Sequence, residues 1–125
     1  MLDHINTLEQ LEIEAKKIDD FLNITCSEQP EEAINRGNDL LVYLARTGKM
    51  LSDAKYWQDE AVNNSIIQKL KDQIDLPPMI LKKFIDSSTK RENYLVIWLD
   101  RMNRTCTHQL DFLRTVISFA KSERR

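Results

Sequence analysis

Apolar residues recur every three or four positions along nearly the whole chain, and this spacing places side chains on one face of an α-helix. The first run occupies residues 4–23, with Asp3 as the expected N-terminal cap. The pattern stops at Asn23, so the sequence predicts a first helix that ends there. Its apolar stripe consists of Ile5, Leu8, Leu11, Ala15, Ile18 and Leu22.

The second run begins after a capping position, for which Ser27 and Gln29 are both candidates. Pro30 falls in its first turn, where proline is well tolerated. No strong helix-breaking signal occurs before the two consecutive prolines, so the sequence predicts a helix over residues 28–74.

Two glycines lie on the apolar stripe of this second helix. Gly37 and Gly48 each cost about 1 kcal/mol relative to alanine in a helix interior. We interpret both as points of close backbone approach, and a kink at Gly48 is the alternative.

The third run follows the prolines, and its apolar positions alternate by three and four almost to the end of the chain. This pattern predicts a helix over residues 78–123. Thr89 and Glu92 fit a capping box, which would end a short helix near residue 87 and start another at residue 90. We favour a continuous helix with at most a kink, and a fourth short helix at 78–87 is the alternative.

The connection between the two long helices defines the expected fold. Only Asp75–Pro78 joins them, so they must form an antiparallel hairpin. Two glycines and three prolines are too few for the many turns of a β-sandwich or barrel. The predicted fold class is therefore all-α: one domain over residues 1–125, a three-helix, coiled-coil-like bundle dominated by the long hairpin.

Charge is unevenly distributed, although the net charge is only −2. Residues 1–35 carry nine acids against two bases, a net charge of −7, and residues 77–125 carry ten bases against five acids, a net charge of +5. We interpret this asymmetry as packing of the acidic first helix beside the basic last one, close to Arg104, Arg114 and Lys121. The alternative is an association of the basic third of the chain with nucleic acid.

Four polar residues lie on or beside the apolar stripe of the last helix. They are Arg91, Thr105, His108 and Gln109. Buried polar groups commonly fix the register of neighbouring helices. We predict that these residues form a polar register layer, and a ligand-binding pocket is the alternative.

Patterns for catalysis and metal binding are missing from the sequence. Its two glycines cannot form a phosphate-binding loop, and neither His-Glu-x-x-His nor Glu-x-x-His occurs. Cys106 and His108 stand two residues apart in a helix and point in different directions, while Cys26 and His4 have no ligand spacing. We therefore expect no enzyme activity, no metal and no cofactor.

Features of export and membrane insertion are missing as well. No apolar stretch approaches the roughly 20 residues that a membrane span needs. No signal-peptide pattern opens the chain, and two cysteines are few for a small secreted domain. We expect a cytoplasmic protein without membrane association.

The first helix is too short to cover the predicted hairpin, because its length is about 30 Å and that of the hairpin about 66 Å. We expect it to cover the end that holds residues 30–50 and 105–125. The other end would pair in a homodimer, unless a break at Ser87–Thr89 folds residues 78–87 back over it. The expected interface residues are Leu51, Trp57, Ile66, Leu70, Leu81, Phe84, Leu95 and Trp98.

Two segments, Leu44–Lys55 and Glu92–Gln109, resemble short helical proteins of gut bacteria and of their phages or mobile elements. The resemblance implies such an origin and a cytoplasmic location, and it implies no activity or residue role. From the helical pattern itself, we expect a non-enzymatic, self-associating helical scaffold or an accessory protein with an unknown protein partner. A nucleic-acid-associated accessory factor is the alternative.

Overall fold

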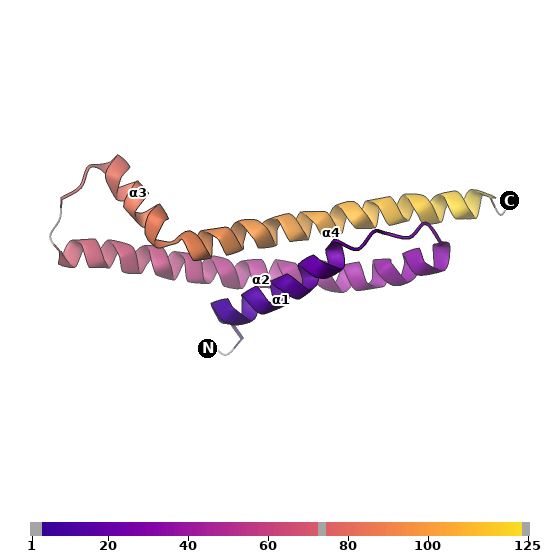
Figure 1. The fold of residues 1–125 in the computed structure, drawn as a ribbon, viewed down its shortest axis with the longest axis horizontal. Coiled ribbons are helices and arrows are strands. Elements are labelled where there is room, and N and C mark those ends of the chain that lie inside the picture. The colour runs from indigo at the N-terminus through magenta and orange to yellow at the C-terminus, as the bar shows by residue number, and fades with distance from the viewer. Residues whose placement is uncertain (1–3, 73–74, 124–125) are drawn as a thin grey trace.

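The computed structural model describes residues 4–72 and 75–123, and this part of the chain contains helices and no strand. The all-α prediction is therefore confirmed. The two longest helices lie side by side and antiparallel, and they form the main packing contact of the fold (Figure 1). In chain order the helices are α1 (Leu8–Leu22), α2 (Pro30–Lys71), α3 (Pro78–Ser88) and α4 (Lys90–Glu123).

Helix α1 begins later than predicted, at Leu8. The Thr7 hydroxyl accepts a hydrogen bond from the Gln10 backbone N–H (3.2 Å), and the Gln10 side chain accepts one from the Thr7 N–H (2.9 Å). This capping box satisfies two backbone donors at the helix start, which is why the helix begins there. The predicted start after Asp3 was wrong, and Asp3 itself lies outside the described residues.

Helix α2 begins at Pro30, two residues after the predicted start, and its N-cap is Gln29, one of the two candidate caps. The other candidate cap, Ser27, instead accepts a hydrogen bond from the Gln29 N–H (3.1 Å). The helix ends at Lys71, three residues before the predicted end, and Ile74 lies outside the described residues.

The favoured continuous helix over residues 78–123 was wrong, and the alternative short helix is present. The Thr89 side chain is buried, and its hydroxyl donates to the Ile85 carbonyl (2.8 Å) and accepts from Asn93 Nδ2 (3.0 Å). It therefore closes the end of α3 and does not form the predicted capping box with Glu92. Figure 1 shows α3 turned sharply away from the axis of α4.

Helix α1 crosses the middle of the hairpin (Figure 1). The contact between this part of the chain and the hairpin begins near Trp57, whose Nε1–H donates to the Asn6 carbonyl (2.7 Å). It ends near Gln109, whose side chain donates to the Leu22 carbonyl (2.9 Å). The prediction that it covers residues 30–50 and 105–125 was therefore wrong in register. The reason is the segment over residues 23–29, which runs outside any helix to the end of the hairpin where α2 begins.

The core lies where α1 meets the hairpin. It contains Leu11, Ala15 and Ile18 from α1, Leu40, Met50 and Ala54 from α2, and Leu95, Leu99, Met102, Cys106 and Leu113 from α4. In α3, by contrast, no side chain is buried.

Neither glycine of α2 marks the close backbone approach that the sequence suggested. A Cβ atom added at Gly37 would meet nothing within 4 Å. At Gly48 its nearest neighbour would be Asn103 Nδ2 at 3.8 Å, which is ordinary contact with a side chain. The helix runs through both positions.

Replacing Leu99 by alanine should lower the free energy of unfolding by about 2–5 kcal/mol, because its side chain is fully buried in the core. The matched control is Ile97→Ala on the same helix, where the side chain is 58% exposed and the change should stay within about 0.5 kcal/mol. Urea denaturation followed by circular dichroism measures both. Equal losses in the two variants would contradict this packing.

Candidate functional site

Of the four residues predicted to form a polar register layer, Gln109 is the one that contacts several elements at once. Its Oε1 accepts hydrogen bonds from an Arg36 guanidinium nitrogen (2.8 Å) and from the Cys26 thiol (3.6 Å). Its Nε2 donates to the Leu22 carbonyl at the end of α1 (2.9 Å). One side chain of α4 therefore holds α1, α2 and the segment between them.

Arg36 extends this cluster towards the aromatic residues. Its guanidinium lies 4.1 Å from the centre of the Phe21 ring, and that ring lies 4.8 Å from the ring of Tyr43. Arg36 Nε is buried and has no hydrogen-bond partner. The cation–π contact places its charge between α1 and α2.

The other three residues of the predicted register layer do not join Gln109. Arg91 lies on the surface, 47% exposed, and forms ion pairs with Glu9 and Glu12 of α1. The Thr105 hydroxyl donates to the Arg101 carbonyl of its own helix (2.9 Å), and His108 is exposed. The four residues do not form a single layer, because α1 covers only one side of α4.

A buried polar tie between the long helices was missed from the sequence. Asn103 Nδ2 donates to the Leu44 carbonyl and to Thr47 Oγ1, both at 3.0 Å. The Thr47 side chain is fully buried. The signal was present, because Asn103 lies four residues after Leu99 and three before Cys106, on the apolar stripe.

A second missed cluster fastens the residues before α1. Asp53 of α2 is only 4% exposed, and it accepts hydrogen bonds from the Asn6 N–H (3.1 Å) and from Lys49 Nζ (2.6 Å). Lys49 Nζ also donates to the His4 carbonyl (2.7 Å). These bonds, with that of Trp57 to Asn6, fix the point where the chain enters α1.

Ion pairs hold α1 against the hairpin. Arg46 of α2 binds Glu14 through two hydrogen bonds of 2.8 and 2.7 Å. Arg91 of α4 binds Glu12 (3.1 Å from Nε). The acidic helix α1 therefore packs against basic residues of the hairpin, as predicted. The particular basic residues that were predicted as its partners were wrong.

The three bases expected beside α1 lie elsewhere. Arg104 pairs with Asp100 of its own helix (3.1 Å). Arg114 and Lys121 line a groove on another face of the hairpin. The reason is the register of α1, which ends before it reaches them.

The candidate metal ligands are not brought together. Within the described residues, no three His, Cys, Asp or Glu side chains lie close enough to hold a metal ion. Cys106 is fully buried, and this burial raises the pKa of its thiol. None of the described helices combines the length and the apolar character that crossing a membrane requires.

The eight residues of the predicted oligomer interface separate into two groups. Leu95 is 1% exposed and belongs to the core, so it is not available to a partner. Leu51, Trp57 and Trp98 pack against that core. The remaining four lie beyond the reach of α1: Leu81 and Phe84 are half-buried, and Ile66 and Leu70 are exposed.

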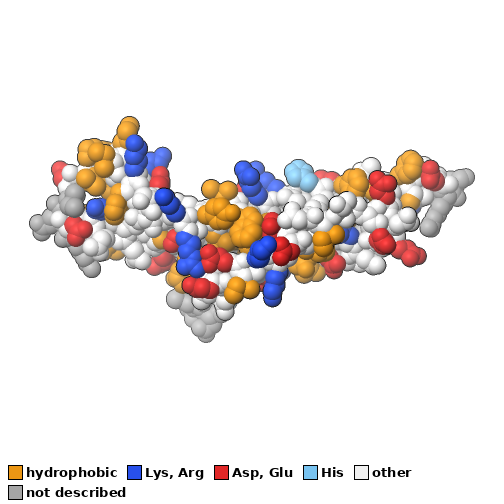
Figure 2. Space-filling view, in the orientation of Figure 1, with side chains coloured by type: hydrophobic (Ala, Val, Ile, Leu, Met, Phe, Trp, Pro, Cys, Tyr) orange, Lys and Arg blue, Asp and Glu red, His pale blue; other side chains and the backbone are white. Residues whose placement is uncertain are grey.

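These four residues belong to what we call the α3 end, the hairpin end formed by residues 66–70 and 78–84. Leu70 is 71% exposed, Met79 73% and Ile80 50%. Lys69 Nζ lies 4.0 Å from the centre of the Phe84 ring, which is a contact between α2 and α3. Figure 2 shows hydrophobic side chains gathered over α3, with basic side chains beside them.

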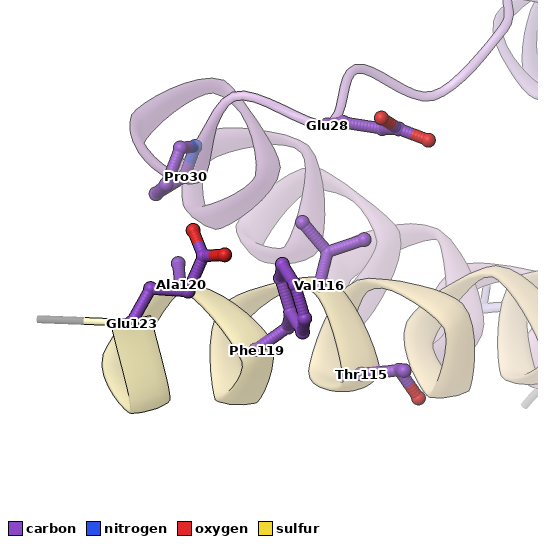
Figure 3. A pocket seen from close by; sticks show the side chains of 7 residues that line it. All are labelled: Glu28, Pro30, Thr115, Val116, Phe119, Ala120 and Glu123. Atoms are coloured by element: carbon purple, nitrogen blue, oxygen red, sulfur yellow. The ribbon is translucent and has the colours of Figure 1, made fainter.

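The opposite end of the hairpin also lacks a third helix, and it carries a shallow groove of about 460 Å³ (Figure 3). Val116 and Phe119 of α4 form its apolar side, and Pro30 faces them from the start of α2. Glu28 and Glu123 stand at its rim. Phe119 is 65% exposed, so this groove is open to solvent.

Thr47→Val should lower the free energy of unfolding by roughly 1–3 kcal/mol, because it removes a buried acceptor of the Asn103 amide. Thr107→Val is the matched control, since Thr107 is exposed and bonds only to a carbonyl of its own helix. Its effect should stay within about 0.5 kcal/mol. Chemical denaturation distinguishes the two, and a near-neutral Thr47→Val would refute the importance of the tie.

The pKa of Glu9 lies below its ordinary value, first because of backbone hydrogen bonding in the first turn of α1 and then because of Arg91. Arg91→Gln should therefore raise this pKa only part of the way. Carbon NMR of the Glu9 carboxyl group measures it, and Lys16→Gln should leave it unchanged.

The lowered pKa of Glu9 sets the sign of the pH dependence of the stability. Since the folded pKa lies below the unfolded value of about 4.3, the stabilisation is present above that pH and is lost as pH falls through the folded value. A Glu9 pKa that rises fully to the ordinary value in Arg91→Gln would contradict the backbone contribution.

Comparison with family models, with curated proteins and with solved structures gives no match for this chain.

Proposed function

We propose that the chain is a non-enzymatic helical scaffold that forms a homodimer through its α3 end. The observation that carries this proposal is that α3 has apolar side chains along its length and fully buries none of them. Its neighbours Ile66, Ile67 and Leu70 on α2 are exposed as well. Contiguous apolar surface of this kind commonly marks an association site.

The α3 end cannot complete a core by itself. The break at Thr89 allows α3 to approach α2, as the fold-back alternative requires, but Leu70 and Met79 stay more than two-thirds exposed. Burying apolar surface contributes about 25 cal/mol of stabilising free energy per Å². A second copy placed against the α3 end would bury apolar side chains that a single copy leaves exposed. A two-fold axis would bring the same surface of both copies together.

The use of the polar side chains supports a structural role. Three polar side chains form hydrogen bonds that hold parts of the chain together, namely those of Gln109, Asn103 and Asp53. A catalytic centre would instead aim such groups at a cavity. Both cysteines are free thiols, which agrees with a cytoplasmic location as part of this proposal.

The nucleic-acid alternative has weaker support. Arg91 and Arg104 are paired with carboxylates of the same chain. Binding to phosphates would have to break these pairs, and its affinity would fall steeply with salt. We therefore favour the scaffold.

Light scattering coupled to size exclusion tests the dimer. The chain at micromolar concentration should have about twice its monomer mass of 14.7 kDa. Leu70→Glu should shift it to monomer, because it places a charge within the proposed interface. A wild-type monomer at this concentration would overturn the proposal.

The matched control is Ile13→Glu on α1, where the side chain is 61% exposed and lies away from the α3 end. This variant should remain a dimer. Circular dichroism should show that both variants keep their helices, because each change is at an exposed position. Loss of the dimer in the control alone would place the interface on α1 and contradict the proposal.

A further inference from the structure

Two hollows of about 440 and 330 Å³ lie one after the other between α2 and α4, on the side of the hairpin away from α1. Gly37 lines the first of them, and Arg46, which binds α1, lies nine residues further along α2. Nine residues are about two and a half helical turns, so the two positions face opposite sides. We call this surface the back groove.

The floor of the back groove is apolar and open. Ile34 and Leu41 of α2 are 49% and 56% exposed, and Ile97 of α4 is 58% exposed. A Cβ atom at Gly37 would meet nothing within 4 Å, so the groove is open at this position. A helix could approach the backbone of α2 closely at this point.

The rim of the back groove is basic. Its two parts are lined by Lys55, Arg101, Arg104, Arg114 and Lys121. Their only acidic lining residue is Asp100, which is paired with Arg104. Apolar floor and basic rim therefore occur together along the groove.

The face of the hairpin that α1 covers also combines apolar surface with basic residues, and it shows what kind of element such a surface binds. There the bound element is an amphipathic helix with an apolar stripe, and its Glu14 and Glu12 pair with Arg46 and Arg91 of the hairpin. The back groove offers the same two features with no occupant from the described chain. From this charge and shape complementarity we infer that it binds an acidic amphipathic helix of a partner protein.

The charges and the floor argue against two other occupants. Two back grooves facing each other across a two-fold axis would place Arg101, Arg114 and Lys121 of both copies together, and like charges repel. Nucleic acid would suit the bases, but it would leave Ile34 and Leu41 against a charged phosphate backbone. An acidic helix satisfies both the rim and the floor.

This site is separate from the α3 end, so it does not depend on the proposed homodimer. The probe is a fluorescein-labelled peptide of residues 4–23 of this chain, which is acidic and carries the apolar stripe of α1. The intact chain keeps its own α1 on the other face through the short connection over residues 23–29. Such a tether gives a high effective concentration, so added peptide does not displace α1 from its own face.

Fluorescence anisotropy should show saturable binding of the peptide to the intact chain, and the binding should weaken as salt is raised. Gly37→Leu fills the groove, and Arg114→Glu reverses a rim charge. Each should weaken binding by about tenfold or more. A peptide with the same composition and scrambled order should not bind.

Two control variants separate the groove from general effects. Gly37→Ala brings the same improvement in helix propensity with little bulk, and Lys17→Glu makes the same charge reversal at an exposed position of α1, outside both proposed surfaces. Both should bind the peptide as the wild type does. Light scattering on Gly37→Leu should still show the homodimer, so failure of this inference is distinguishable from failure of the proposed function.

Four results would overturn the inference: no saturable binding, equal binding to all variants, release of the peptide by a 20-nucleotide single-stranded DNA, or loss of self-association in Gly37→Leu. The third would assign the groove to nucleic acid. The fourth would assign it to a second copy of the chain.

Discussion

Two antiparallel helices can bury only the stripes along which they touch, and this limit governs the rest of the structure. Helices α2 and α4 have 42 and 34 residues, whereas α1 has 15 and spans about 22 Å at 1.5 Å per residue. One short helix can therefore cover one face of the hairpin over its middle. The back groove and both ends have to stay in water or find another chain, and exposed apolar residues occur at all three places.

Polar contacts determine which arrangement of these helices is adopted. Apolar stripes of leucine and isoleucine tolerate a slip by one turn, but a slip would leave the Asn103 amide without Thr47 and the Leu44 carbonyl. An unsatisfied buried group of this kind costs about 1–3 kcal/mol. Asp53 and Gln109 act in the same way on the two ends of α1. The position of α1 is thus set by hydrogen bonds that the apolar pattern does not contain.

The parts of the fold that could be predicted depend on sustained periodicity and on proline. The structure confirms the predicted helix start at Pro78, and Pro30 lies in the first turn of α2 as predicted. The start of α1 and the break at Thr89 depend on which partner a threonine hydroxyl takes, and tertiary contacts decide that choice. Likewise, Gln109 was recognised as a polar residue on an apolar stripe. Its neighbour His108 was misplaced, because only the position of α1 decides which side of the stripe is covered.

Charge connects the sequence to both proposed surfaces. The acids of α1 neutralise Arg46 and Arg91, but the second half of α4 keeps Arg114 and Lys121 beyond its reach. The net charge of +5 over residues 77–125 is therefore only partly compensated by the acidic helix. Repulsion between these bases disfavours pairing of two back grooves, which supports the α3 end as the surface at which we propose that two copies meet. Because the two surfaces lie apart, a partner helix can occupy one while a second copy occupies the other, which is the property a scaffold needs.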